Sequence, residues 1–221
     1  MNMIDKKQEK HLVRHFQRTY PSQLAPDGDL GPKTRHTLVM SELFERVQDR
    51  FAGTGYNRMC ILFMLAKHHV GKGGDGKRNN HGAFLDNMRR DCGFPPRNGA
   101  WCAVYASWEL LYEFGRDLVL SRGARALVRN VAKFNSPQQR LAGVTITNIA
   151  RNAPDDFLGI ASYGKGSNGV GMGHVRFIGR LDGQLFYIGG NETREDKVCW
   201  GLLTHAEFED KLLQVATIVP A

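Results

Sequence analysis

The chain lacks the motifs that define several protein classes. Its 221 residues include four cysteines, which have neither the spacing of a zinc motif nor that of a disulfide framework. The longest apolar run, residues 60–66, is much shorter than the roughly 20 residues of a membrane span. Asp-rich loops of EF-hand type are absent as well. We therefore expect no metal, no cofactor and no integral membrane span. We also expect mostly reduced, buried thiols at Cys60, Cys92 and Cys199, with Cys102 as the exception.

Two other common motifs are incomplete. Residues 1–10 are charged and do not form an apolar signal segment, so we expect synthesis in the cytoplasm without a Sec signal. Gly71, Gly76 and Lys77 have the spacing of a phosphate-binding P-loop, but Arg78 replaces the required Ser or Thr. The preceding segment also has a helical pattern where a strand is needed. Residues 71–80 are therefore expected to form an exposed basic loop rather than a nucleotide site.

The chain is basic, with 30 Lys and Arg against 22 Asp and Glu and a formal net charge of +8. Residues 58–97 carry much of the excess, whereas residues 153–221 are richer in acidic side chains. A positive surface favours anionic polymers, which include nucleic acid, lipid headgroups and the bacterial wall. The alternative is a basic surface without a dedicated partner.

Cys102 lies where a loop ends and an apolar helix is expected. The first turn of a helix presents unpaired backbone N–H groups and the positive end of the dipole, which favours the nucleophilic thiolate. The N–H of Cys102 is also placed to donate to an oxyanion. Cys102 is therefore a candidate nucleophile.

A candidate base, His174, opens a β-prone segment that follows a glycine-rich loop. Asp182-Gly183 favours a two-residue hairpin turn, and pairing Leu181 with Gln184 across it puts Asn191 opposite His174. Cysteine, histidine and asparagine would then form a nucleophile, a base and an orienting group. A bulge at the glycines 189 and 190 would slip the register by one residue and turn Asn191 to the other face.

Each of these three residues also has a structural interpretation. Free cysteine is among the most buried residue types, so Cys102 could simply belong to the core. A lone histidine at the start of a strand is usually structural. Asn191 after two glycines could occupy a left-handed turn position.

Four segments in order, residues 80–85, 101–103, 173–175 and 189–191, resemble the CHAP and NlpC/P60 group of papain-like cysteine amidases and peptidases. The resemblance covers about residues 58–203. It implies an α+β fold with a papain-like core, in which the helix bearing the cysteine packs on a central antiparallel sheet. Residues 121–148 look like an insertion relative to that group.

The same resemblance implies site residues and a substrate. Cys102 would be the nucleophile, His174 the base and Asn191 the orienting residue, with peptidoglycan amide bonds as the usual substrate. Trp101, Asn80 and Arg176 are expected to line the cleft and contact the substrate. Arg176 would also keep the imidazole of His174 neutral by like-charge repulsion.

The N-terminal region predicts a separate helical domain. Apolar residues recur at helical spacing in residues 11–17, and Pro32 suits the first turn of a second helix. The string from Asp27 to Arg35 resembles the loop and helix start of the small three-helix peptidoglycan-binding domain, although a generic helix-turn-helix linker is the alternative. We therefore expect domains at residues 1–52 and 58–221, joined by a hinge at 53–57.

These observations predict a monomeric, cysteine-dependent peptidoglycan hydrolase acting on the cell wall in the periplasm. Phage holin-dependent release or a secretion machine would bring it there, as for an endolysin or an antibacterial effector. Two alternatives remain: a non-catalytic wall-binding protein, and a nucleic-acid-binding protein that uses the basic loop at residues 71–78. Nucleic acid is not expected as a partner of the hydrolase.

Overall fold

The computed structural model divides the chain into two compact units, Met1–Arg46 and Val47–Ala221. The division falls within helix α2 (Pro32–Phe51), whereas the sequence suggested a boundary after this helix. The structure describes residues 6–20, 24–54, 56–75, 81–96, 100–115, 118–134, 144–147, 155–163, 173–192, 196–204 and 212–218.

The first unit contains helix α1 (Lys6–Thr19) and the start of α2. α2 begins at Pro32, as predicted, because the fixed φ of proline suits a first helical position where the missing N–H leaves no bond unmade. The intervening loop is organised by Gln17 of α1, which is almost fully buried. Its side-chain amide donates to Asp27 Oδ1 at 2.8 Å and to the carbonyl oxygen of Asp29 at 3.0 Å.

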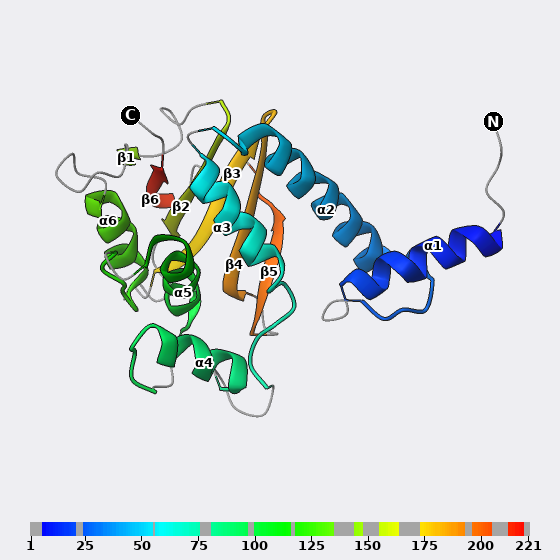
Figure 1. Ribbon diagram of the computed structural model, residues 1–221, viewed down its shortest axis with the longest axis horizontal. Helices are drawn as coiled ribbons and strands as arrows, with labels where there is room; N and C mark the ends of the chain where they lie inside the picture. Colours follow the sequence, from blue (N-terminus) through cyan, green and yellow to red (C-terminus); the bar gives the residue numbers. More distant parts are fainter. Residues whose placement is uncertain are drawn as a thin grey trace. The chain divides into compact units, whose positions relative to one another are not determined.

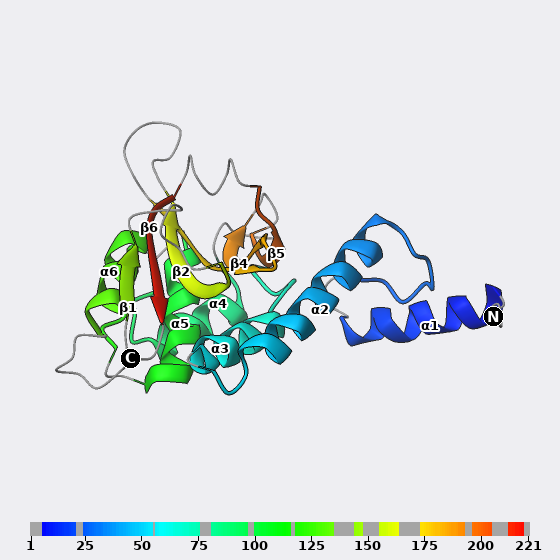
Figure 2. The same cartoon turned by 90° about the horizontal axis from the view of Figure 1, so that it is seen from above.

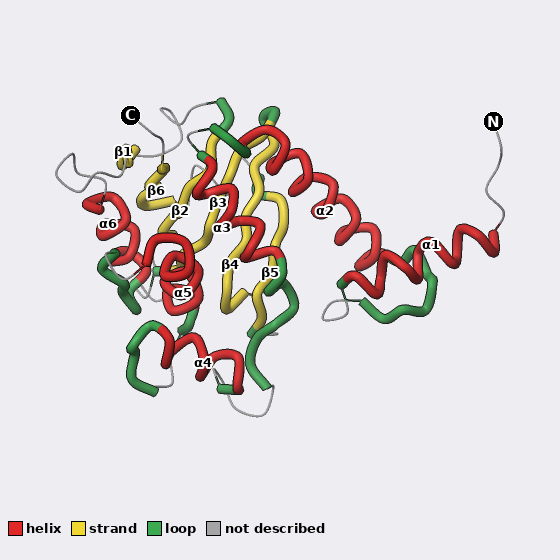
Figure 3. The backbone as a smooth tube through the Cα atoms, in the orientation of Figure 1, coloured by secondary structure: helices red, strands yellow, loops and turns green. Residues whose placement is uncertain are grey.

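The second unit combines four helices and six strands among its described residues, so the expected α+β class is confirmed. The strands form one antiparallel sheet in the order β1-β6-β2-β3-β4-β5 (Figures 1 and 3). The helices are α3 (Asn57–Lys67), α4 (Ala83–Asp91), α5 (Cys102–Phe114) and α6 (Ala124–Phe134). The strands are β1 (Val144–Thr147), β2 (Phe157–Tyr163), β3 (His174–Leu181), β4 (Gln184–Glu192), β5 (Lys197–Leu202) and β6 (Leu212–Ile218).

Helix α5 is the central helix of this unit. Ten of its 13 residues are buried, as expected for a helix that is covered on all sides rather than on one stripe. It packs against strands β3 and β4 and against helices α3, α4 and α6, and α3 and α5 lie on the same face of the sheet (Figure 2). α6, which belongs to the predicted insertion, contacts β1, β2, β3 and β6. α6 is therefore part of the packed core of this unit.

The predicted hairpin joins β3 and β4. Leu181 pairs with Gln184, and the register continues without a slip to Phe177 opposite Ile188. Asp182 and Gly183 have φ angles of 49° and 76°, as a type I′ turn requires. The hairpin therefore fixes the position of β4 relative to His174 at the other end of β3.

None of the helices in the described ranges is both long enough and apolar enough to cross a membrane.

Candidate active site

Cys102 is the first residue of α5, at the position predicted from the sequence. Its exposed fraction is only 3%, so Cys102 is buried like Cys60. Cys92 and Cys199 are partly exposed, so the prediction that Cys102 is the exception among buried thiols is wrong. Because a residue in the first helical turn has no acceptor within its own helix, the backbone N–H of Cys102 is available to a ligand. The sulfur atom and a potential oxyanion donor therefore lie on the same residue.

His174 is the first residue of β3 and contacts Cys102 and Glu192. Its Nε2 lies 2.6 Å from Glu192 Oε1, and the side chain of Cys102 is its other polar neighbour. Since Nε2 is engaged by the carboxylate, Nδ1 is the ring nitrogen left for the thiol. The three side chains form one series, from cysteine through histidine to glutamate.

The third member of this series corrects the prediction that Asn191 faces His174. The sheet register shifts between Gly189 and Glu192, and Asn191 has a φ of 60°. This left-handed residue in the bulge turns the following side chain, that of Glu192, toward His174. Asn191 thus adopts the left-handed conformation considered as its structural interpretation, and Glu192 takes the orienting position.

The carboxylate of Glu192 is shared between His174 and Arg176. Arg176 donates from Nε to Oε1 and from Nη2 to Oε2, each at 2.6 Å, in the bidentate geometry that suits a guanidinium and a carboxylate. Burial raises the pKa of Glu192, but the hydrogen bonds from His174 and Arg176 outweigh it and hold this pKa below its usual value. Glu192 is therefore an anion whose two oxygens are both fixed.

Two tyrosine rings hold Arg176 in this position. The guanidinium carbon lies 4.1 Å from the ring centroid of Tyr187 and 5.0 Å from that of Tyr163. Burial raises the pKa of Tyr163 to about 12, although Arg176 opposes the rise, so its phenol is neutral at physiological pH. Arg176 is thus fixed by one carboxylate and two rings.

The prediction that Arg176 keeps the imidazole of His174 neutral is wrong. Burial lowers the pKa of His174, but the hydrogen bonds and charges of Cys102 and Glu192 outweigh it and raise the pKa from 6.5 to about 9. The positive charge of Arg176 is compensated by Glu192, which bonds both cations. His174 is therefore an imidazolium at neutral pH.

The other two residues expected to contact substrate are Trp101 and Asn80. Trp101 is fully buried and donates its indole N–H to Asp196, so it has no exposed surface in this structure. A Cβ atom at Gly190 would lie 2.8 Å from Tyr105 Cβ and closer still to the Trp101 ring. Trp101 thus packs the start of α5 against the β4 bulge instead of lining a cleft. Asn80 lies outside the described residues.

A cavity of about 330 Å³ lies beside Cys102. One wall is formed by Ala100, Cys102 and Gly173, the residue before His174. The other wall is formed by Arg122, Gly123, Ala124, Arg125, Ala126 and Arg129. The predicted nucleophile therefore borders a space large enough to hold part of a ligand.

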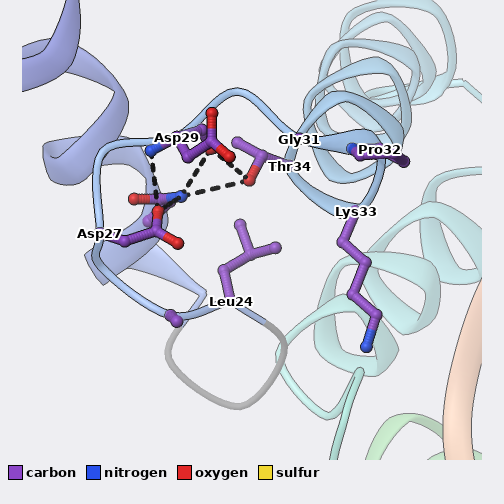
Figure 4. A pocket seen from close by; sticks show the side chains of 9 residues that line it. Leu24, Asp27, Asp29, Gly31, Pro32, Lys33 and Thr34 are labelled. Carbon is purple, nitrogen blue, oxygen red and sulfur yellow. Dashed lines mark hydrogen bonds between the residues drawn. The ribbon is translucent and has the colours of Figure 1, made fainter.

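The first unit has a smaller cavity, of about 200 Å³, at the loop predicted to resemble a peptidoglycan-binding domain. Figure 4 shows its lining side chains, which include Asp27, Asp29 and Thr34. Gln17 Nε2 lies 3.2 Å from Thr34 Oγ1, and Thr34 Oγ1 donates to the carbonyl oxygen of Asp29 at 3.1 Å. These polar groups bond one another, so the loop is held in one conformation.

Two contributions to the site were missed by the sequence reasoning. One is Glu192. The two glycines before Asn191 could have indicated it, since a bulge at these glycines places Glu192, rather than Asn191, opposite His174. The other is the arginine-rich start of α6, because no sequence pattern indicates that it lies near Cys102. Within the described ranges, no three His, Cys, Asp or Glu side chains form a group that could hold a metal ion.

In the comparisons with known proteins, no family model, no curated protein and no solved structure matches this chain.

The raised pKa of His174 predicts an alkaline limit to its protonated state. The imidazolium that would protonate a leaving amine should persist through neutral pH and be lost as pH rises through about 9. The contribution of this group to folding stability should be complete below 6.5, its ordinary pKa, and should disappear over the same rise. The measurement is the pH dependence of kcat/KM for the predicted cleavage of peptidoglycan. A decline in kcat/KM centred near pH 6.5 would contradict the raised pKa of His174.

Proposed function

We propose that this protein is a cysteine-dependent hydrolase of amide bonds and that its second unit has a papain-like core. The observation that carries the proposal is the series of Cys102, His174 and Glu192, in which the carboxylate holds one nitrogen of the base and the thiol is the other polar neighbour of the ring. An activated thiol needs both an adjacent base and a group that orients the base. Each of the three residues supplies one of these parts.

In the proposed reaction, Cys102 attacks the carbonyl carbon of an amide as a thiolate. The C–S bond forms, the oxyanion accepts a hydrogen bond from the backbone N–H of Cys102, and the C–N bond breaks as His174 protonates the leaving amine. Water then attacks the thioester, His174 accepts its proton, and the C–O bond replaces the C–S bond. The products are an amine and a carboxylic acid. Cleavage of the C–S bond restores the thiolate beside the imidazolium of His174, and the acid then loses its proton to water.

The proposed substrate is peptidoglycan. Support comes from the resemblance of the segments around Cys102 and His174 to peptidoglycan amidases and peptidases, and from the string at residues 27–35 that resembles a peptidoglycan-binding domain. The net charge of +8 also favours an anionic polymer such as the bacterial wall. An endolysin and a secreted antibacterial effector would both use this chemistry.

Mass spectrometry of purified peptidoglycan digested by the wild type and by Cys102→Ala tests the proposal. We expect new amine and carboxyl termini with the wild type, and their loss by about 1,000-fold or more with Cys102→Ala, because the variant has no nucleophile. The masses of the fragments identify the bond that is cut.

Cys92→Ala is the matched control, since Cys92 follows the last residue of α4 and does not belong to the series of Cys102, His174 and Glu192. It should release the same fragments as the wild type. Equal digestion by Cys102→Ala would exclude the cysteine mechanism. Binding of intact peptidoglycan without new termini would favour the non-catalytic wall-binding alternative.

A further inference from the structure

Among the residues that the structure describes, the cavity beside Cys102 is lined by three arginines and by no acidic residue. Arg125 and Arg129 lie one turn apart on α6, Arg122 comes two residues before the helix begins, and all three border the cavity. The first turn of α6 contains no Asp or Glu that would compensate them. Like charges four residues apart destabilise a helix, so Arg125 and Arg129 carry a cost that nothing on α6 offsets.

Other arginines of the second unit have carboxylate partners. Arg58 pairs with Glu113 at 2.9 Å, and Arg176 pairs with Glu192 at 2.6 Å. Over the part of the chain that the structure describes, no carboxylate lies within ion-pair distance of Arg122, Arg125 or Arg129. The cavity therefore combines a nucleophile with three guanidinium groups that have room to bind an anion.

We propose that this cavity is a subsite for a carboxylate group of the substrate. The inference rests on the proposed function, because a group held here belongs to the molecule whose amide carbonyl Cys102 attacks. Guanidinium groups bind carboxylates bidentately, which would fix the position of the substrate as well as attract it. A volume of about 330 Å³ is at the small end for ligand pockets, which fits one portion of a peptide.

Gly173 lies between the arginine wall of the cavity and His174. A Cβ atom at this position would lie 3.0 Å from the backbone oxygen of Tyr163 and 3.6 Å from Arg125 Cγ. The chain thus passes close to the arginine wall immediately before His174. A carboxylate in the cavity would consequently lie near the scissile amide on the same substrate molecule.

Alkylation of Cys102 by two small reagents tests the anion site without requiring hydrolysis. Iodoacetate carries a carboxylate and iodoacetamide is its neutral counterpart, so their rate ratio at Cys102 reports the attraction of the cavity for an anion. We expect this ratio, measured by peptide mass spectrometry, to be about tenfold higher at Cys102 than at Cys92 of the same molecule. Added salt should reduce the difference.

Substitution of the arginines completes this test. Arg125→Gln and Arg129→Gln should each lower the ratio at Cys102, and the triple variant with Arg122→Gln should lower it further. The part of the preference that remains in the triple variant is due to the imidazolium of His174. Arg90→Gln, at an exposed arginine on α4, should leave the ratio at Cys102 unchanged. Equal ratios at Cys102 and Cys92 in the wild type would overturn the subsite.

Peptidoglycan with its free carboxyl groups converted to amides separates this inference from the proposed function. The wild type should cleave untreated peptidoglycan about tenfold faster than the amidated form, and the triple variant should cleave the two alike. Equal cleavage of both forms by the wild type would overturn the subsite and leave the hydrolase in place. Failure to cleave either form, with the reagent preference retained, would overturn the hydrolase and leave the anion site.

Discussion

Glu192→Ala is expected to lower kcat/KM for peptidoglycan cleavage by about 100-fold or more, because the imidazole loses the group that orients it. Asn191→Gly is the decisive comparison, since glycine adopts the left-handed conformation of Asn191 and removes only its side chain. That variant should retain activity within about twofold. A large loss of kcat/KM with Asn191→Gly and a small loss with Glu192→Ala would instead assign the orienting role to Asn191.

Glu192→Gln separates orientation from charge. It keeps the volume and one acceptor oxygen, so its loss of activity should be smaller than that of Glu192→Ala. It removes the anion that helps to raise the pKa of His174, so the alkaline decline should move below about 9. An unchanged pH profile would show that Glu192 only supports the fold around Arg176.

Gly190→Ala is expected to destabilise the second unit by about 1–3 kcal/mol or more and to lower activity with it. The new Cβ would lie 2.8 Å from Tyr105 Cβ and against the Trp101 ring, and both side chains are fully buried. This clash can be relieved only if the β4 bulge or the start of α5 shifts. Because Cys102 is the first residue of α5, a shift of the helix start would move it. Denaturant unfolding and the rate of Cys102 alkylation are the two measurements.

Gly31→Ala provides the matched control. Its Cβ would meet only Asp29 Oδ2, at 3.8 Å, and its backbone is outside the left-handed region. Stability should therefore change by less than about 0.5 kcal/mol. If Gly31→Ala and Gly190→Ala lowered the free energy of unfolding by similar amounts, the loss could not be attributed to the contact between Gly190 and Trp101.

Local sequence signals were sufficient for the elements that carry the candidate site. Proline at the start of α2 and the Asp-Gly turn between β3 and β4 act over a few residues, so their consequences could be deduced from the sequence. The register of the hairpin followed from the turn alone and held as far as Ile188. The identity of the side chain opposite His174 could not be deduced from the turn. The bulge depends on the packing of Gly190 against Trp101, which is far away in the sequence.

The cavity wall was beyond sequence reasoning for a different reason. α6 lies in a segment that differed from the family pattern, and its contacts with β1, β2, β3 and β6 are all tertiary. Nothing in residues 122–129 indicates that they face Cys102. Trp101 was misjudged because an aromatic residue beside a nucleophile suits a cleft and a core equally well, and only its burial distinguishes them.

Helix α2 determines where this chain can be cut for recombination with other modules. Val47 and Phe51 lie in the second unit and are buried, and Val47 accepts a hydrogen bond from Cys60 Sγ through its backbone oxygen at 3.8 Å. A chimera that exchanged residues 1–52 would remove these core residues together with the N-terminal unit. An exchange that ends at Arg46 preserves them, provided that the incoming segment finishes as a helix in phase with the remainder of α2.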